Sequence, residues 1–328
     1  MPRQAFRVAW QANPCHASGM SVPYPSRLPK MSAALWLQLV ILSVLWGGSF
    51  LLGRIATTEI PALTLAFARV VLAAAALWLF FLGSRRTLPP LSGLLPPLLL
   101  LGLLNNAIPF SLIFWGQREI GAGLASVLNA MTPVWTVMLA QVITRDEKLT
   151  LEKSIAVLTG FVGVAVLVGE TAANGLSGPI PAKLAVLAAS LSYAAAAIFG
   201  RRFRAVDPVF IACGQLSASA ILLFPAALVM DGAASLSMPS AATLMAVLAL
   251  ALLCTAVAYV LFFRILAAAG ATNTSLVTFL IPVSALLLGA WLLDEKLSRS
   301  DIAGMALIAI ALLLIDGRST RWFKRALG

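Results

Sequence analysis

Charged side chains are scarce in this sequence: Asp, Glu, Lys and Arg make up 11% of its 328 residues, whereas 61% of the residues are hydrophobic. A water-soluble domain carries roughly 25% charged residues, which it needs to cover its surface. The scarcity of charge therefore excludes a soluble globular protein. A helix of about 20 apolar residues spans the hydrocarbon core of a bilayer. The composition therefore predicts an all-α integral membrane protein whose surroundings are the lipid bilayer.

Side chains that bind metals are also few. The sequence holds one histidine, His16, and three cysteines, Cys15, Cys213 and Cys254, with no Cys-x-x-Cys pair. An odd number of scattered cysteines excludes a disulfide framework, and a zinc site needs several His, Cys or carboxylate ligands at close spacing. We therefore expect no metal and no cofactor.

Acidic residues are missing from the interior of every apolar run. All of the 12 Asp and Glu residues lie in predicted loops or at predicted helix ends, as Glu59, Asp231 and Asp294 do. An enzyme that works inside the membrane needs a nucleophile with a base, or metal ligands, at membrane depth. The sequence provides neither His nor carboxylate there, so we expect no catalytic residues and no enzyme.

Basic residues exceed acidic ones by 23 to 12, which gives a net charge of +11. They lie in short breaks between apolar runs, as in Arg85-Arg86 and Arg201-Arg202, and form no single basic patch. This is the distribution of the positive-inside rule, which places both termini in the cytoplasm. We expect no nucleic-acid partner. The Ala- and Leu-rich composition, with more Arg than Lys, favours a bacterial inner membrane.

Ten apolar runs predict ten transmembrane helices. They cover residues 34–53, 62–82, 92–115, 121–143, 152–169, 183–200, 208–230, 241–265, 271–293 and 301–316. The division between the eighth and ninth runs, near Gly270, rests on the less hydrophobic sequence Ala-Gly-Ala-Thr-Asn. Residues 1–30 are polar and predict a disordered tail, and residues 318–328 predict a basic cytoplasmic tail.

The two halves of the chain repeat each other. Trp46, Gly53, Arg54 and Pro61 correspond to Tyr193, Gly200, Arg201 and Pro208, each 147 residues later. The tetrapeptide Asp-Glu-Lys-Leu at 146–149 recurs at 294–297. The repeats cover residues 34–169 and 183–317 and hold five predicted helices each. Because five is odd, the second copy enters the membrane in the opposite orientation, an arrangement typical of secondary transporters.

The motifs resemble those of EamA-type permeases, which belong to the drug/metabolite transporter superfamily, over residues 34–317. The resemblance is carried by Trp46 to Phe50, by Pro61 with Arg69, by Gly121 to Ala125, and by the two acidic turns. It implies a ten-helix fold of two EamA domains around a central cavity. It also implies export or uptake of amino acids or related small metabolites by alternating access.

The absence of a membrane carboxylate also bears on energy coupling. Proton-driven carriers commonly place an acid at membrane depth. Either an acid at a helix end couples transport to protons here, or the protein is a facilitator. The four-helix multidrug transporters of the same superfamily use a membrane glutamate, so the sequence argues against their mode of binding cationic drugs.

Three polar residues inside apolar runs are candidates for the substrate cavity. Arg69 lies in the second predicted helix, where a cation must face the bundle interior. It either contacts a substrate carboxylate or has a structural role with backbone carbonyls. Asn105 and Asn106 form a polar pair in the third predicted helix. They either line the cavity or form interhelical hydrogen bonds.

Aromatic residues and prolines complete the candidate site. Trp46, Tyr193 and Tyr259 predict an apolar cavity wall, although aromatic residues also anchor helices at the membrane interface. Pro133 and Pro282 interrupt two predicted helices and indicate a kink, which either gates the cavity or only serves packing.

The inverted repeat favours a secondary transporter, exporting a small-molecule substrate. A membrane sensor or assembly partner without flux is the alternative, and an intramembrane enzyme is a weaker one. Monomer and homodimer both remain open.

Overall fold

The structure is a computed structural model that describes residues 32–84, 86–90, 93–143, 151–173, 180–203, 205–232, 238–274, 276–295 and 298–316. Every regular element in these ranges is helical, which confirms the predicted all-α class for this part of the chain. The predicted tails, at 1–30 and 318–328, lie outside the described residues, as does the first acidic turn at 146–149.

Seven helices in the described ranges are long and apolar enough to cross a membrane. Two are single α-helices in the first half, α2 (Ala33–Ala56) and α3 (Ala62–Gly83). The next two are compound, made of α4 (Leu95–Gly102), η1 (Leu103–Ala107) and α5 (Ile108–Gly116), and of α6 (Ala122–Asn129) and α7 (Thr132–Ile143).

The other three long helices follow residue 179. They are α9 (Ile180–Gly200) with the short η2 (Arg201–Phe203), α10 (Pro208–Met230), and α11 (Ala241–Ala251) with η4 (Leu252–Val257) and α12 (Ala258–Thr274). Three further helices contain shorter apolar stretches: α8 (Leu151–Ala173), α13 (Val277–Leu292) and α14 (Arg299–Asp316).

Several helices begin where the sequence provides a side-chain cap. The Ser32 hydroxyl accepts a hydrogen bond from the N–H of Leu35 at the start of α2. The Asp207 carboxylate accepts hydrogen bonds from the N–H groups of Val209 and Phe210 at the start of α10. These bonds satisfy backbone donors that have no partner within the helix.

Both halves contain a π-helical turn at equivalent positions. The first is η1, which includes Asn105 and Asn106, and the second is η4, which includes Cys254 and Thr255, 149 residues later. A π-helical turn widens the helix and is frequent at functional sites. The sequence repeat is therefore accompanied by a repeated backbone irregularity.

The two prolines singled out in the sequence lie in different settings. The helix from Ala122 to Ile143 is interrupted after Asn129, and Pro133 lies in the first turn of α7, where its missing N–H costs no helical bond. Pro282 lies inside α13, which continues on both sides of it.

The predicted division near Gly270 is wrong by several residues. The helix α12 continues through Gly270 to Thr274, and α13 begins at Val277 rather than at residue 271. A single glycine costs a helix only about 1 kcal/mol relative to alanine. With alanines on both sides, Gly270 does not end the helix.

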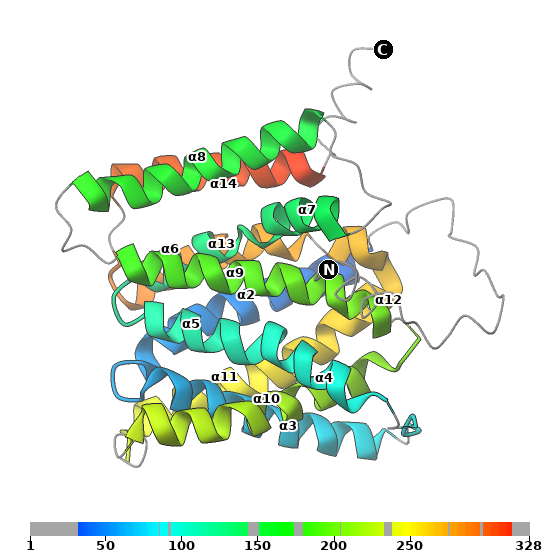
Figure 1. Ribbon diagram of the computed structural model, residues 1–328. Helices are drawn as coiled ribbons and strands as arrows, with labels where there is room; N and C mark the ends of the chain where they lie inside the picture. Colours follow the sequence, from blue (N-terminus) through cyan, green and yellow to red (C-terminus); the bar gives the residue numbers. More distant parts are fainter. Residues whose placement is uncertain are drawn as a thin grey trace, which may run out of the picture.

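Helices of the first half pack along helices of the second half (Figure 1). The helix α3 packs on α10, α2 on α13, α5 on α9, and α8 on α14. Small residues allow close approach in these pairs: a Cβ on Gly116 would lie 2.8 Å from the carbonyl oxygen of Ala182, and one on Gly163 would lie 2.9 Å from that of Gly304. Such small-residue crossings are the usual way in which helices associate in a bilayer.

Candidate functional site

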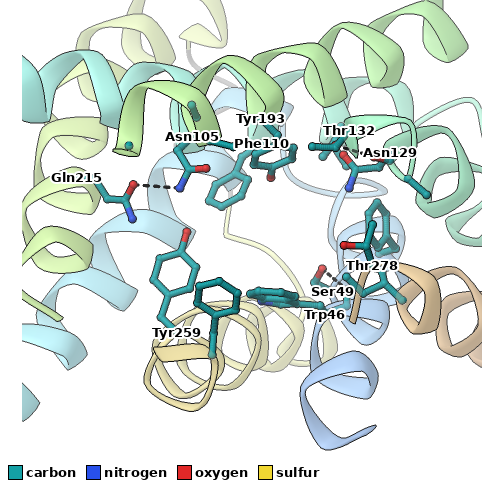
Figure 2. A pocket seen from close by; sticks show the side chains of 18 of the residues that line it. Trp46, Ser49, Asn105, Phe110, Asn129, Thr132, Tyr193, Gln215, Tyr259 and Thr278 are labelled. Carbon is teal, nitrogen blue, oxygen red and sulfur yellow. Dashed lines mark hydrogen bonds between the residues drawn. The ribbon is translucent and has the colours of Figure 1, made fainter. Parts of the chain in front are cut away.

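A cavity of about 450 Å³ lies in the interior of the helix bundle. Helices of both halves contribute to its wall, among them α2, α3, α9, α10, α12 and α13. Its lining includes Trp46, Ser49, Arg69, Asn105, Phe110, Asn129, Thr132, Tyr193, Gln215, Tyr259, Phe262, Thr278 and Pro282 (Figure 2). The volume is within the range that holds a small-molecule ligand.

Arg69 provides the positive charge of the cavity. Its side chain is 7% exposed, and its Nε donates a hydrogen bond of 2.9 Å to the Thr255 hydroxyl in η4. That hydroxyl in turn donates to the Leu250 carbonyl. The guanidinium carbon lies 4.0 Å from the centroid of the Phe110 ring, a cation–π contact. These contacts fix the guanidinium of a first-half helix against a π-helical turn of the second half.

The two asparagines of η1 reach different partners. Asn105 lines the cavity and donates a 3.0 Å hydrogen bond from Nδ2 to Oε1 of Gln215 on α10. Asn106 is fully buried beside the cavity, and its Oδ1 accepts a 3.1 Å hydrogen bond from the Tyr259 hydroxyl. Two consecutive side chains of η1 therefore meet two different helices of the second half.

Aromatic side chains form the broad faces of the cavity. Phe110 and Tyr193 lie on one side of the open space, and Trp46 and Tyr259 lie on the other (Figure 2). The Trp46 ring packs against Phe262, with 5.5 Å between centroids. The three aromatic residues predicted to be cavity residues, Trp46, Tyr193 and Tyr259, therefore lie around one space.

A second polar group lies where α6 and α7 meet. Asn129 and Thr132 line the cavity there, across it from Asn105 and Gln215 (Figure 2). The Thr132 hydroxyl donates to the Asn129 backbone carbonyl. The Asn129 side-chain oxygen is buried and has no hydrogen-bond partner among the described residues. The residue therefore lines the cavity with other atoms, while its side-chain oxygen is buried behind the wall.

The structure therefore brings together most of the residues proposed from the sequence. The candidates that line the cavity are Trp46, Arg69, Asn105, Tyr193, Tyr259 and Pro282. Asn106 lies just behind the lining. Pro133 is next to the lining residue Thr132 but does not itself line the cavity.

Sequence reasoning missed Gln215 and Phe110. Gln215 could have been found as the one strongly polar side chain inside the apolar run 208–230. Phe110 had no such signal, because phenylalanines occur throughout the apolar runs. Its role depends on the side of the helix it occupies, which the widened turn at η1 changes.

Three carboxylates accept hydrogen bonds from residues at or next to helix N-termini. They lie at the end of the bundle where α2 ends and α3 begins. Glu295 accepts hydrogen bonds from the N–H groups of Ala122 and Gly123 at the start of α6. Asp231 accepts from the N–H and hydroxyl of Thr64 in α3. Glu59 accepts from the N–H and hydroxyl of Ser240, the residue before α11.

These contacts connect turns that are distant in the sequence. The hydrogen bonds that the Glu59 carboxyl accepts lower its pKa, first the one from the backbone N–H of Ser240 and then the one from the Ser240 hydroxyl. At the same end, an Arg54 Nη atom donates to the carbonyl of Gln117. Hydrogen bonds therefore connect the turns at this end of the bundle to one another.

The cavity and its helices agree with comparisons to known proteins. The model of the EamA-like transporter family matches residues 32–169 and 180–316. The chain belongs to the EamA-like transporter family. Two matched segments in one chain agree with the duplicated motifs, and the helices of both segments line the same cavity.

Relatives within this EamA-like family match more than four fifths of the chain. The "Uncharacterized inner membrane transporter YedA" of Escherichia coli K12 is 27% identical over 84% of this chain and 89% of its own length. The "Uncharacterized transporter YoaV" of Bacillus subtilis is 24% identical over 85% and 95%. The "Probable amino-acid metabolite efflux pump" of Escherichia coli K12 is 29% identical over 87% and 95%.

One solved crystal structure has the same fold, with a TM-score of 0.61 at 18% sequence identity. It covers 86% of this chain and 97% of its own. Together with the apolar helices, the relatives support a multi-pass membrane protein with a general transporter role. Family membership and these names point to a transporter rather than an enzyme.

Proposed function

We propose that this protein is a secondary transporter that exports amino acids or related small metabolites across the inner membrane by alternating access. The observation that carries the proposal is the cavity, which joins helices of both halves around the cation of Arg69 and has neither Asp nor Glu in its described lining. The name of one relative, an efflux pump for amino-acid metabolites, is in keeping with this substrate class and direction.

The proposed architecture is a bundle of ten transmembrane helices in two inverted repeats of five. The paired π-helical turns η1 and η4 support it, as does the packing of first-half helices on second-half helices. The distribution of basic residues favours both termini in the cytoplasm. In such a carrier, the substrate site lies near the middle of the bilayer between the repeats.

Each candidate residue has a proposed role. Arg69 binds a carboxylate of the substrate, and Trp46, Tyr193 and Tyr259 enclose its apolar part. Asn105 and Asn106 tie η1 to α10 and α12 and thereby hold the cavity wall in place.

The two prolines have a proposed mechanical role. Pro282 lies within α13 at the cavity, where its missing backbone hydrogen bond makes the helix easier to bend. Pro133 follows the interruption between α6 and α7, and there the break in the helix provides the hinge. We assign to both prolines the bending that opens and closes the cavity.

In the proposed orientation the structure is inward-facing. The cavity extends from Arg69 towards Gly200 and Ile211, which lie near the turn between α9 and α10, on the cytoplasmic side. The opposite end carries the carboxylate contacts of Glu59, Asp231 and Glu295. Those contacts would have to break before substrate could leave on the outer side.

Transport is tested with the purified full-length protein in proteoliposomes. Influx and efflux of a labelled panel of amino acids and metabolites are measured with and without a pH gradient, against empty liposomes. Flux of one compound class that the gradient accelerates indicates a proton-coupled carrier, and flux that ignores the gradient indicates a facilitator. Binding without flux in folded protein would contradict the proposal and favour a sensor.

A further inference from the structure

Two amide side chains from different halves of the chain lie together in the cavity wall. Asn105, in η1, and Gln215, in α10, both line the cavity, and Nδ2 of Asn105 donates a 3.0 Å hydrogen bond to Oε1 of Gln215 (Figure 2). Gln215 is only 5% exposed. This one bond is sufficient to tie η1 to α10, and it uses only half of the polar atoms of the two amides.

Each amide has one polar atom left over. A side-chain amide carries one oxygen, which accepts, and one NH₂ group, which donates. The bond between the two amides leaves Oδ1 of Asn105 and Nε2 of Gln215. Neither of these atoms has a hydrogen-bond partner among the described residues, and neither is among the fully buried polar atoms that lack one. Both atoms are therefore accessible from the cavity that their residues line.

The pair thus presents one acceptor and one donor side by side. Exchanging the oxygen and the nitrogen in both amides would reverse their bond, yet it would again leave one free oxygen and one free NH₂ group. Other polar groups of the lining offer less. The guanidinium of Arg69 only donates, and the hydroxyls of Ser49 and Thr132 already donate to nearby backbone carbonyls. A ligand group that matches the pair must both accept and donate.

A primary carboxamide has this combination. Its oxygen accepts from Nε2 of Gln215, and its NH₂ group donates to Oδ1 of Asn105. A carboxylate has no donor and would place an oxygen against Oδ1, an ammonium has no acceptor, and a hydroxyl has only one oxygen with which to reach both atoms. A hydrocarbon group would displace water from both atoms and leave them unpaired. Sites that lose buried hydrogen bonds with the wrong ligand discriminate strongly against it.

We propose that Asn105 and Gln215 form a carboxamide-binding subsite. The cavity then prefers amino acids with a side-chain amide, such as asparagine and glutamine, over the corresponding acids and hydrocarbons. The α-carboxylate binds Arg69, and the side-chain amide binds the pair. This inference rests on the proposed function in taking the cavity as the substrate site, and it adds the group by which one amino acid is selected over another.

Amino acids of equal shape test the subsite. Asparagine, aspartate and leucine share one side-chain skeleton and differ only at its two terminal atoms. Glutamine, glutamate and 2-amino-5-methylhexanoate form the same series with a longer side chain. Their affinities for the purified full-length protein in nanodiscs are measured by isothermal titration calorimetry. In at least one series we expect the amide to bind about tenfold or more tightly than both analogues. If the amide has no such advantage in either series, the inference is overturned.

A double variant assigns the preference to the pair. Asn105→Leu with Gln215→Met replaces both partners of the hydrogen bond by apolar side chains of similar size, a change that leaves no partner unpaired. We expect the order to reverse, with leucine binding more tightly than asparagine. The matched control Gln141→Met changes an exposed glutamine outside the cavity lining and leaves the affinities as they were. An unchanged preference for the amide in the folded double variant would show that the pair does not form the subsite.

The results separate this inference from the proposal of transport. Equal binding of amides, acids and hydrocarbons, together with flux in proteoliposomes, would overturn the subsite and leave transport intact. Selective binding of an amide without flux would contradict transport but support the subsite. If the double variant does not fold, the order within the two series on the unmodified protein still decides.

Discussion

The carboxylate of Glu295 is bound to the N–H groups of Ala122 and Gly123, more than 170 residues away in the sequence. The two donor–acceptor distances are 2.6 and 3.0 Å. Glycines make room for the carboxylate: a Cβ on Gly121 would lie 2.8 Å from its carboxyl carbon, and one on Gly289 would lie 2.6 Å from its Oε2. A negative charge at the start of α6 is also favoured by the helix dipole.

Replacing this acid should loosen the end of the bundle. In Glu295→Gln the charge is lost and one oxygen becomes an N–H₂ group, which faces a backbone donor. We expect a loss of about 1–3 kcal/mol of stability, measured as a lower thermal unfolding temperature in detergent. The matched control is Asp294→Asn, because Asp294 is exposed and its positive φ of 51° is tolerated by asparagine. Equal destabilisation by both variants would contradict a specific role of Glu295.

The hydroxyl of Thr255 should be needed to position Arg69. In Thr255→Val the side chain keeps its shape, but Nε of the buried arginine loses its acceptor. We expect a cost of about 1–3 kcal/mol in stability, measured as a lower thermal unfolding temperature in detergent. Thr255→Ser retains the hydroxyl and should restore the stability. Normal stability in the valine variant would show that this hydrogen bond does not hold the guanidinium.

Adjacent glycines in α2 provide a test of helix packing. A Cβ on Gly47 would lie 2.1 Å from Oγ of Ser284 and 2.9 Å from the backbone nitrogen of Ala285, so α2 and α13 would have to separate. We expect Gly47→Ala to destabilise the protein by about 1–3 kcal/mol, read from thermal unfolding. At Gly48 the nearest atom is the tip of Leu288 at 3.8 Å, so Gly48→Ala should be neutral or slightly stabilising.

The contact between Glu59 and Ser240 should depend on pH. Its hydrogen bonds lower the carboxyl pKa below the ordinary value of 4.5. A group whose pKa is lowered by folding stabilises the protein above the unfolded-state pKa and loses that contribution as the pH falls through the folded-state pKa. We therefore expect the unfolding temperatures of wild type and Glu59→Gln to differ at neutral pH and to converge in the range below pH 4.5. A difference that stays constant down to pH 3 would contradict this.

The sequence was sufficient for the positions of most helices, because hydrocarbon thickness sets their length and charges mark their ends. The division near Gly270 was misplaced by the same reasoning: glycine is a weak helix breaker among alanines, and no charge marks the actual end at Thr274. The proline itself predicted an interruption near residue 133. The sequence did not predict that Pro133 would lie in the first turn of a new helix, α7.

The site was predictable where a residue is out of place in hydrocarbon. Arg69 and Asn105 were found because a polar side chain in an apolar run must face the interior. The buried, unpartnered oxygen of Asn129 could not be found in this way, since it depends on which atoms are near it in three dimensions. The stacking of Phe110 on Arg69 was equally hidden, because it depends on the rotation of one helix relative to another.

The widened turns η1 and η4 allow the rotation of one helix relative to its neighbours to change. Residues along an α-helix follow one another at about 100° around the axis, so adding or removing one residue in a widened turn swings every side chain beyond it to a new face. A shortened η1 would turn Phe110 and Phe114 away from Arg69 while every amino acid beyond the deletion stayed the same. In this fold, a change of helical phase could therefore alter ligand preference without replacing any of the side chains that touch the ligand.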